Sequence, residues 1–374
     1  MKHFSFLFLI ILTACSTPQA ERGQIRENVV SSDRFHVKYA TGFRISVVDE
    51  GIMLDIPKPY ANASKGLRYL LTEQRPAKAP DNTTIIEVPV QSIVCTSTTH
   101  LPLLEYIGMS QRLVGFPDTD LIFSPVFRKE VEKDKIKDLG NGQSINPEHV
   151  LSLSPDLIMA YTMSNNNEFD KLEKLGIPTL MNVDYLENHP LGRAEWIKVA
   201  GLLFGRYAEA DSVFRAIEAE YLRVAALVQP GGECVFSGSL YGDTWFMPGG
   251  ESFAARLLAD AGYDYAWKET RQTGALQLSF ESVFDQAREC TYWISPFGFT
   301  DMAGLTAADE RYGAFEAWKK GKVYAFDARL SDTGSNDYME QGYLRADIVL
   351  KDLVKIRRED LLPEYSLYFY RKLE

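Results

Sequence analysis

The stretch SINPEHVL at residues 144–151 has a counterpart further along the chain, QLSFESVF at residues 277–284. When the two are aligned, Glu148 falls on Glu281, 133 residues later, and apolar residues match on both sides of each glutamate. Internal repeats of this size usually mean two similar domains, because solenoids are built from shorter and more numerous units. The chain therefore folds, on this reading, into two like-shaped halves.

Each half alternates short apolar strands with amphipathic helices. The first half has candidate strands at 93–95, 113–116, 157–161 and 178–181, and the second half at 234–237, 291–295 and 322–326. At the repeat offset the strand 157–161 falls on 290–294. Apolar strands separated by helices indicate parallel sheets covered on both faces. We predict an α/β fold of two Rossmann-like lobes with parallel sheets.

The strongest helical signal lies between the halves. Apolar residues recur there at spacings of three and four, the pattern of one buried helix face: Val213, Phe214, Ile217, Tyr221, Val224 and Val228. Gly205 separates a first helix, 191–204, from a second, 208–228. At ~1.5 Å per residue the second helix would be ~30 Å long, enough to lie across both lobes and join them.

The first residues indicate export from the cytoplasm. A short basic start at 1–3 precedes an apolar run at 4–12 that is too short for a membrane-spanning helix of ~20 residues. Leu12-Thr13-Ala14-Cys15 resembles a lipoprotein processing box, which implies cleavage before Cys15 and its lipidation. An ordinary cleaved signal is the alternative. We expect an extracytoplasmic protein, anchored to a membrane, periplasm-facing or on the cell surface, through the lipid on Cys15.

Composition changes divide the chain further. Residues 33–83 contain period-2 strand patterns and an Asp-Glu-Gly turn, typical of a small β-rich extension to which the sequence assigns no role. The predicted organisation is a signal peptide (1–14), a lipidated tether (15–32), the extension (33–83), an N-terminal binding lobe (84–190), an interlobe helical segment (191–230), a C-terminal binding lobe (231–340), and a closing helix and tail returning to the N-terminal lobe (341–374).

Charge and cysteine usage exclude several classes of protein. The formal net charge of -11 argues against binding to nucleic acid or, by charge, to anionic lipid. Cys95, Cys234 and Cys290 are too widely spaced for a metal site, and the histidines show no paired spacing. We expect no resident metal or cofactor. For the cysteines we favour three buried thiols over the alternative, a disulfide between Cys234 and Cys290.

The segment from Asn146-Pro147-Glu148 to Pro155-Asp156-Leu157-Ile158 resembles the periplasmic-binding family for ferric siderophores, haem and cobalamin. The resemblance covers roughly residues 84–361. The second copy departs from the family pattern, since Arg288-Glu289 replaces Pro-Asp. The stretch LGRAEWIK at 191–198 resembles a variant found in iron-complex-binding lipoproteins, and we interpret its Arg193 and Glu195 as a polar lock between the lobes.

The resemblance implies a docking role for Glu148 and Glu281. One carboxylate on each lobe, displayed at a helix N-terminus, would form bidentate contacts with arginines on an ABC permease dimer. The alternative is that each acid merely favours the positive end of its helix, worth ~0.3–1 kcal/mol. Because the two glutamates occupy matching repeat positions, we favour docking.

A ligand is expected in the cleft beyond the carboxyl ends of the strands. This rule selects Thr98, Thr99, His100, Asp118, Tyr161 and Tyr185 on the first lobe, and Tyr241, Trp245, Gly250, Ser252, Phe297 and Arg329 on the second. Tyr241 and Trp245 lie in a stretch rich in glycine and polar residues, so we favour a cleft wall over core packing. Structural alternatives stay open for others: helix capping for His100 and Ser252, and buried packing for Tyr161 and Tyr185.

The leading hypothesis is a monomeric, non-enzymatic receptor that captures a ferric siderophore or similar iron complex and delivers it to an ABC permease. A cobalamin or other corrinoid is the second candidate, and haem the third. A hydrolase is disfavoured because the sequence contains no Gly-x-Ser-x-Gly, His-Glu-x-x-His or phosphate-loop motif. A third class is a surface interaction protein that binds a partner through residues 33–83.

Overall fold

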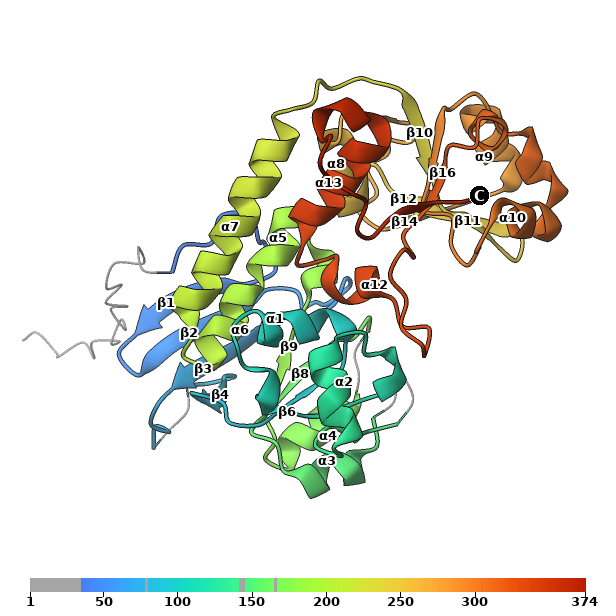
Figure 1. Ribbon diagram of the computed structural model, residues 1–374. Coiled ribbons are helices and arrows are strands. Elements are labelled where there is room, and N and C mark those ends of the chain that lie inside the picture. Colours follow the sequence, from blue (N-terminus) through green and yellow to red (C-terminus); the bar gives the residue numbers. More distant parts are fainter. Residues whose placement is uncertain (1–34, 78–79, 141–144, 165–166) are drawn as a thin grey trace, which may run out of the picture.

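The computed structural model describes residues 35–77, 80–140, 145–164 and 167–374. Two α/β lobes, a small N-terminal sheet and a group of helices between the lobes make up the molecule (Figure 1). The predicted signal peptide, Cys15 and tether lie outside the described residues.

The first lobe is built on a five-stranded, all-parallel sheet with the order β7-β6-β5-β8-β9. Its strands are β5 (Ile93–Cys95), β6 (Leu113–Phe116), β7 (Lys137–Asp138), β8 (Leu157–Ala160) and β9 (Thr179–Met181). The connecting helices are η2 (Thr98–His100), α1 (Leu101–Glu105), η3 (Ser110–Arg112), η4 (Thr119–Leu121), α2 (Pro125–Glu132), α3 (Pro147–Leu153), α4 (Asn167–Lys174) and η5 (Asp184–Leu186). Strands β5 and β8 are wholly buried, as expected for a sheet covered on both faces.

The second lobe repeats this design in a five-stranded sheet of order β13-β10-β15-β16-β17. Its strands are β10 (Cys234–Ser237), β13 (Asp264–Tyr265), β15 (Tyr292–Ile294), β16 (Val323–Ala325) and β17 (Arg371–Lys372). Strands β6, β5, β8 and β9 of the first lobe correspond in order to β13, β10, β15 and β16 of the second. The helices of this half are α8 (Phe253–Asp260), α9 (Phe280–Ala287), α10 (Met302–Ala308), η6 (Glu310–Ala314) and α11 (Glu316–Lys319). The predicted fold class is confirmed.

A three-stranded antiparallel sheet in the second lobe was not expected from the sequence. It has the order β11-β12-β14, with β11 (Ser239–Tyr241), β12 (Thr244–Pro248) and β14 (Ala275–Leu278). Trp245 on β12 is 0% exposed, and its ring lies 5.6 Å from that of Trp293 on β15. The prediction that Trp245 forms a cleft wall is therefore wrong, because the β12 strand turns this side chain into an aromatic core.

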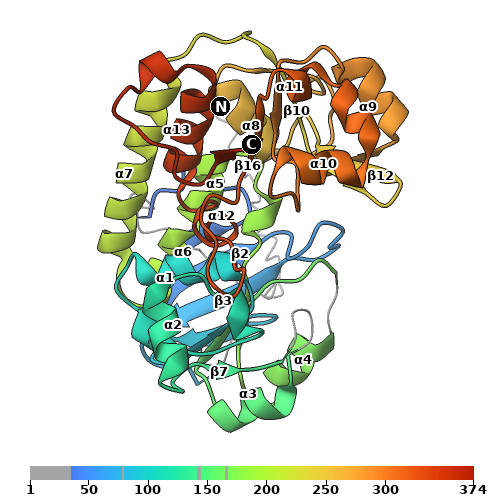
Figure 2. The ribbon, with the colours of Figure 1, turned by 45° about the vertical axis from the view of Figure 1, so that its right-hand side comes forward.

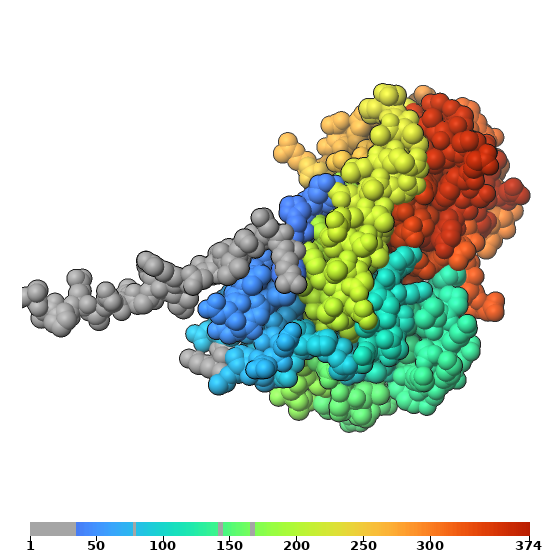
Figure 3. Space-filling model, turned by 60° about the vertical axis from the view of Figure 1, so that its left-hand side comes forward, coloured from blue at the N-terminus to red at the C-terminus, as the bar shows by residue number. Residues whose placement is uncertain are grey.

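The lobes are joined by α5 (Pro190–Glu195), α6 (Ile197–Leu203) and α7 (Tyr207–Ala225). Gly205 takes a φ of +66° between α6 and α7, a conformation that favours glycine. The face of α7 that is buried follows the predicted spacing: Ala210, Phe214, Ile217, Tyr221 and Val224. With 19 residues α7 is about 28 Å long. Figure 3 shows it, in yellow, running across the surface from one lobe to the other.

The N-terminal extension forms a four-stranded sheet of order β1-β2-β3-β4, with β1 (Arg44–Val48), β2 (Gly51–Ile56), β3 (Leu67–Thr72) and β4 (Thr84–Glu87). Strand β4 pairs in parallel with β3, so the boundary predicted at residue 84 is wrong and residues 84–87 belong to the extension. Buried residues of this sheet, including Leu54 and Tyr69, share one hydrophobic core with the first lobe. The extension is therefore packed into the body of the protein.

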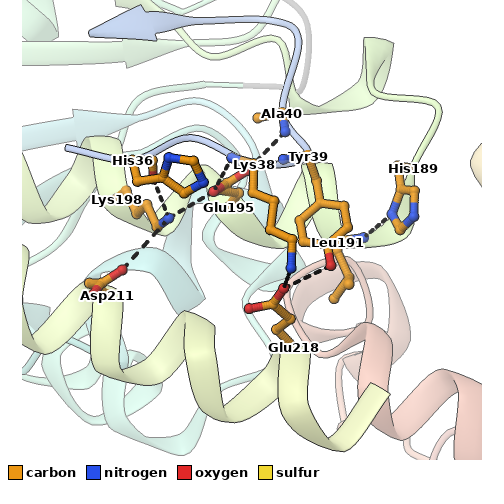
Figure 4. A network of polar contacts seen from close by, with 10 residues as sticks. All are labelled: His36, Lys38, Tyr39, Ala40, His189, Leu191, Glu195, Lys198, Asp211 and Glu218. Atoms are coloured by element: carbon orange, nitrogen blue, oxygen red, sulfur yellow. Dashed lines mark hydrogen bonds and ion pairs between the residues drawn. The ribbon is translucent and has the colours of Figure 1, made fainter. Parts of the chain in front are cut away.

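The segment before this sheet is held by two buried carboxylates, those of Glu187 and Glu195, of which Figure 4 shows Glu195. Glu195 on α5 accepts the main-chain N–H groups of residues 38–40 at 2.7–3.1 Å, and the ammonium of Lys198 at 2.7 Å. Glu187 accepts the N–H groups of Thr41 and Gly42, each at 2.8 Å. We call residues 36–42 the strap. The prediction that Glu195 locks one lobe to the other is wrong, since its oxygens bind the strap.

The C-terminal residues close the molecule. Helix α12 (Asp337–Gln341) lies between the lobes in Figures 1 and 2, and α13 (Ala346–Arg357) packs against α7 and α8 before η7 (Glu359–Leu361). Gln341 and Arg345 contact Tyr106 of the first lobe at 3.2 and 2.9 Å. Strand β17, however, pairs with β16 of the second lobe. The prediction that the whole of 341–374 returns to the first lobe is therefore wrong.

Cys234 and Cys290 form a disulfide, with their Cα atoms 4.7 Å apart. It joins the first residue of β10 to the turn before the neighbouring strand β15. The preferred prediction of three free thiols is wrong for this pair, because parallel neighbours bring two distant strand starts together. Cys95 is a free, buried thiol.

Candidate functional site: the interlobe cleft

A cavity of about 650 Å³ opens at the carboxyl ends of the second-lobe strands. Its floor is formed where β10 and β15 end, at Ser237 and Ile294. Side chains of β12, α8 and α12 form its walls, and Tyr185 and Arg193 approach it from the first lobe and the interlobe helices. The cavity therefore occupies the position at which open α/β sheets bind ligands.

The second-lobe wall is aromatic. Phe297, which is 68% exposed, lies after β15 and packs against Phe326 with ring centroids 6.1 Å apart. Phe246 and Tyr338 also line the cavity. Contact between large aromatic rings and water is unfavourable, so such rings favour a ligand that covers them. Few polar side chains converge on this part of the cavity. This wall is suited to a ligand with a conjugated or apolar face.

The first lobe contributes a pair of tyrosines. The rings of Tyr161 and Tyr185 meet edge to face with centroids 5.1 Å apart, and Tyr185 Oη donates to the carbonyl of Thr162 at 2.9 Å. Burial raises the pKa of Tyr185 to about 12, so its hydroxyl stays protonated at neutral pH. Tyr161 is 36% exposed and packs against Tyr185 without lining the cavity itself.

Arg193 lies where the interlobe helices meet the cleft. Its Nε donates to the carbonyl of Asp184 at 3.1 Å, and the guanidinium carbon lies 3.8 Å from the ring of Phe253 and 4.3 Å from that of Tyr343. Asp184 belongs to the first lobe and Phe253 to the second. Arg193 therefore contacts both lobes, as the polar-lock interpretation required of it.

Helix α12 and the residues before it contact the first lobe directly. Glu340 accepts the N–H groups of Phe123 at 2.7 Å and Ser124 at 3.1 Å, and Thr98 Oγ1 donates to the carbonyl of Met339 at 3.1 Å. Glu340 is 1% exposed, and burial raises its pKa to about 8. These bonds close one side of the cleft.

The structure brings together some of the residues selected from the sequence. Tyr185, Ser252 and Phe297 line the cleft, and Tyr161 contacts Tyr185. Ser252 also caps α8, accepting the N–H of Ala255 at 3.2 Å, so both interpretations of this residue apply.

Other selected residues lie elsewhere. His100 is 0% exposed, which excludes it as a ligand contact here, and burial lowers its pKa to about 3. Gly250 lines a separate cavity of about 510 Å³ on the strap side of α8, and its N–H is donated to Thr270 Oγ1. Asp118, with a φ of +57°, follows β6 in a loop that does not border the cleft cavity.

The remaining selected residues do not line the cleft cavity. Tyr241 is 83% exposed on the β11–β12 hairpin, and Arg329 is paired with Asp337 at 2.6 Å. The hydroxyl of Thr98 donates to the carbonyl of Met339, and the N–H of Thr99 donates to Ser97 Oγ at 3.3 Å.

Sequence reasoning missed several cleft residues, among them Phe246, Tyr338, Tyr343 and Phe253. Phe246 had a readable signal, since β12 alternates buried and exposed residues with period 2 and Phe246 is the outward-facing ring. Tyr338 lies at the start of α12 and Tyr343 just after its end. Because α12 reaches the cleft only through long-range packing, no local pattern marks these two residues.

Glu148 and Glu281 occupy equivalent positions. Each is the second residue of its helix, α3 or α9, and each is exposed. Asn146 caps α3 and Ser279 caps α9 through side-chain bonds to main-chain N–H groups. Helices α3 and α9 lie at the far ends of the two lobes (Figure 2). Glu281 is also paired with Arg311 at 3.2 Å.

Comparison with known families agrees with this geometry. A family model described as "Periplasmic binding protein" matches residues 93–330, which include the first-lobe sheet, every strand of the second-lobe sheet except β17, and most of the cleft lining. The chain belongs to this family. The resemblance seen in the sequence is therefore confirmed, and a periplasmic binding protein of this family is extracytoplasmic.

One curated relative and two solved structures are similar to the chain. An uncharacterized lipoprotein of Methanocaldococcus jannaschii is 24% identical over 305 residues, covering 79% of this chain and 72% of the relative. A possible iron-binding periplasmic solute-binding protein from Staphylococcus epidermidis shares the fold, with a TM-score of 0.56, 17% identity, and coverage of 72% of this chain and 99% of that one. A periplasmic haem-binding protein from Pseudomonas aeruginosa matches with a TM-score of 0.57, 17% identity, and coverage of 76% and 98%.

Two further kinds of feature are absent from the described residues. Among them, no helix is both long and apolar enough to cross a membrane. In the same part of the chain, no cluster of three or more His, Cys, Asp or Glu side chains is arranged to hold a metal ion.

Proposed function

We propose that this periplasmic binding protein is the solute-binding lipoprotein of an ABC importer, and that its solute is a ferric siderophore or similar iron complex. The observation that carries the proposal is the aromatic-walled cavity of about 650 Å³ at the strand ends between the lobes. Metal complexes of organic chelators combine apolar or conjugated faces with polar edges, and such a cavity supplies partners for both.

The solved structures that share the fold support a metal complex as the class of solute. One is named as a possible iron-binding protein and another as a haem-binding protein. Haem and a corrinoid therefore remain the competing solutes for this cleft, and the binding experiment below includes both.

Attachment to a membrane through Cys15 is part of the proposal. The lipoprotein processing box at 12–15 supports it, as does a relative that is itself named a lipoprotein. A Cys15→Ala variant should appear in the soluble fraction after osmotic shock, whereas the wild-type chain should remain with membranes. Equal partition of both forms would contradict the anchor.

The binding experiment uses the full-length chain purified in mild detergent. Intrinsic tryptophan fluorescence is titrated with ferric citrate, ferrioxamine B, haem and cyanocobalamin. We expect saturable binding at micromolar concentration or tighter for an iron complex. Saturation by cyanocobalamin alone would replace the iron assignment with a corrinoid, and no saturation by any of the four would contradict the proposed function.

A further inference from the structure

Arg193 has hydrogen-bonding capacity that the protein leaves unused. Its side chain lines the cleft although the residue is only 8% exposed. A guanidinium offers five N–H donors and stays charged at all accessible pH values. Within the described residues, Nε bonds to the carbonyl of Asp184, while Nη1 is buried without a hydrogen-bond partner.

The charge of Arg193 is also incompletely compensated. In the described part of the chain no acidic side chain forms an ion pair with it, although 25 such pairs join other residues. Asp184 offers it a main-chain carbonyl, and the Asp184 carboxyl attracts the guanidinium from beyond ion-pair distance. The rings of Phe253 and Tyr343 attract the cation without accepting an N–H in its plane. A buried, unpaired cation is unfavourable, so a partner supplied from outside would be bound strongly.

We infer that Arg193 receives an anionic group of the bound solute, so that the cleft selects metal complexes carrying a free carboxylate. This inference rests on the proposed function of the cleft. A carboxylate matches the planar guanidinium with two parallel N–H···O bonds and would satisfy the donors that the protein leaves free. The packing of Phe253 and Tyr343 against Arg193 holds the guanidinium in position before the solute arrives.

The test compares solutes that differ in anionic groups. Ferric citrate and haem carry carboxylates, whereas ferrioxamine B is cationic and cyanocobalamin carries no free carboxylate. Their affinities for the full-length protein are measured by calorimetry for the wild type, Arg193→Gln and Arg193→Lys. Arg223→Gln is the matched control, because Arg223 is an exposed arginine on α7 paired with Glu220.

We expect the wild type to bind at least one anionic complex more tightly than both of the others. Arg193→Gln should weaken that binding by about 10- to 100-fold, Arg193→Lys should lose less, and Arg223→Gln should match the wild type. Wild-type affinity in a folded Arg193→Gln variant would overturn the inference. So would tighter binding of ferrioxamine B or cyanocobalamin by the wild type, a measurement that needs no variant. Wild-type affinity of the variant, or tighter binding of ferrioxamine B, would leave the proposed function standing. Binding of cyanocobalamin alone would change its solute, and failure to bind any of the four complexes would contradict it.

Discussion

At the scale of the residue, some aromatic side chains of the second lobe pack in its core and others are exposed in the cleft. Trp245 is 0% exposed and its Nε1 donates to the carbonyl of Ser237 at 2.9 Å, whereas Phe297 is 68% exposed in the cleft. Phe297→Ala should therefore weaken solute binding while changing the free energy of unfolding by less than about 0.5 kcal/mol. Trp245→Ala should lower that free energy by about 3–5 kcal/mol, because it leaves a cavity in the core.

Urea denaturation and calorimetric titration of both variants check this pair of predictions. A Phe297→Ala protein with wild-type affinity would show that the exposed ring does not contact the solute. A Trp245→Ala protein of wild-type stability would contradict its position in the core.

Glu195 gives a second prediction at this scale. Its carboxylate accepts three main-chain N–H groups of the strap and the ammonium of Lys198, which is 2% exposed. Glu195→Gln should lower the free energy of unfolding by about 3 kcal/mol, because charge-assisted bonds are lost and a buried Lys loses its closest counter-charge. The urea midpoint measures the effect.

Glu218 supplies the control for Glu195. It also binds the strap, through the Lys38 ammonium and the Tyr39 hydroxyl, but it lies near the surface with a side chain that is 16% exposed. Glu218→Gln should cost less than about 1 kcal/mol. An equal loss of stability in the two variants would show that burial does not explain the contribution of the Glu195 carboxylate to the free energy of unfolding.

At the scale of the element, the helix starts of α3 and α9 carry the proposed docking pair. The double variant Glu148→Ala/Glu281→Ala should abolish uptake of the solute in cells and leave solute affinity unchanged. Neither residue lines the cleft cavity, and the helices that carry them, α3 and α9, lie at the far ends of the lobes (Figure 2). Asp170→Ala/Asp285→Ala, which removes two exposed acids from α4 and α9, is the charge-matched control and should transport normally. Normal transport by the glutamate variant would refute docking.

The disulfide between β10 and the start of β15 gives a further element-scale prediction. It closes a loop of 56 residues, for which the chain-entropy account gives a stabilisation of about 4 kcal/mol. Cys234→Ala/Cys290→Ala should therefore lower the free energy of unfolding by about 2–4 kcal/mol without altering solute affinity. Cys95→Ala, which removes the free thiol, is the comparison. An unchanged midpoint for the double variant would contradict a structural role.

Elements differ in how far the sequence predicts them. The α7 helix and the strands β5, β8 and β10 follow from local periodicity and apolar runs, and their predicted bounds are close to those observed. The pairing of β4 with β3 and of β17 with β16 depends on partners brought in by the whole fold. Local patterns contain no information on such partners, so both domain boundaries that depend on them were misplaced.

At the scale of the whole molecule, contact between the lobes should depend on pH. Burial is the largest cause that raises the pKa of Glu340 to about 8 from an ordinary value of 4.5, while the N–H groups of Phe123 and Ser124 lower it and Asp337 and Glu105 raise it. Between these pH values the folded protein holds a proton that the unfolded chain has released. The free energy of unfolding should therefore fall as pH rises through this window, by at most about 1.4 kcal/mol per pH unit from this group.

Urea midpoints at pH 5, 6, 7 and 8 test the prediction through the difference between the wild type and Glu340→Gln. The variant should lose less stability as the pH rises, because its amide cannot ionise. Glu132→Gln, an exposed acid on α2, should keep the wild-type slope. Parallel curves for Glu340→Gln and the wild type would exclude Glu340 as the source.

The candidate site also shows what whole-chain packing adds to a sequence. The rule that ligands bind beyond strand ends located the cleft and three of its residues, Tyr185, Ser252 and Phe297. The rule could not tell that β12 turns Trp245 inward, that η2 buries His100, or that α12 crosses to the first lobe. The burial of these side chains and the position of α12 depend on which loops are covered by segments distant in the sequence.

The two acids that hold the strap recognise peptide groups, and with the exception of the Thr41 hydroxyl no strap side chain enters their bonds. A peptide N–H is the same for every residue except proline. Natural relatives that keep this arrangement can therefore vary residues 38–41 without losing these bonds, but must preserve acids at the positions of Glu187 and Glu195. Gly42 is fixed as well, because a Cβ added there would lie 2.9 Å from Glu187 Oε1 and 2.9 Å from the Trp196 ring. Two invariant acids opposite a segment of variable sequence would therefore identify the strap in a relative, even where the sequence of the strap itself is not recognisably similar.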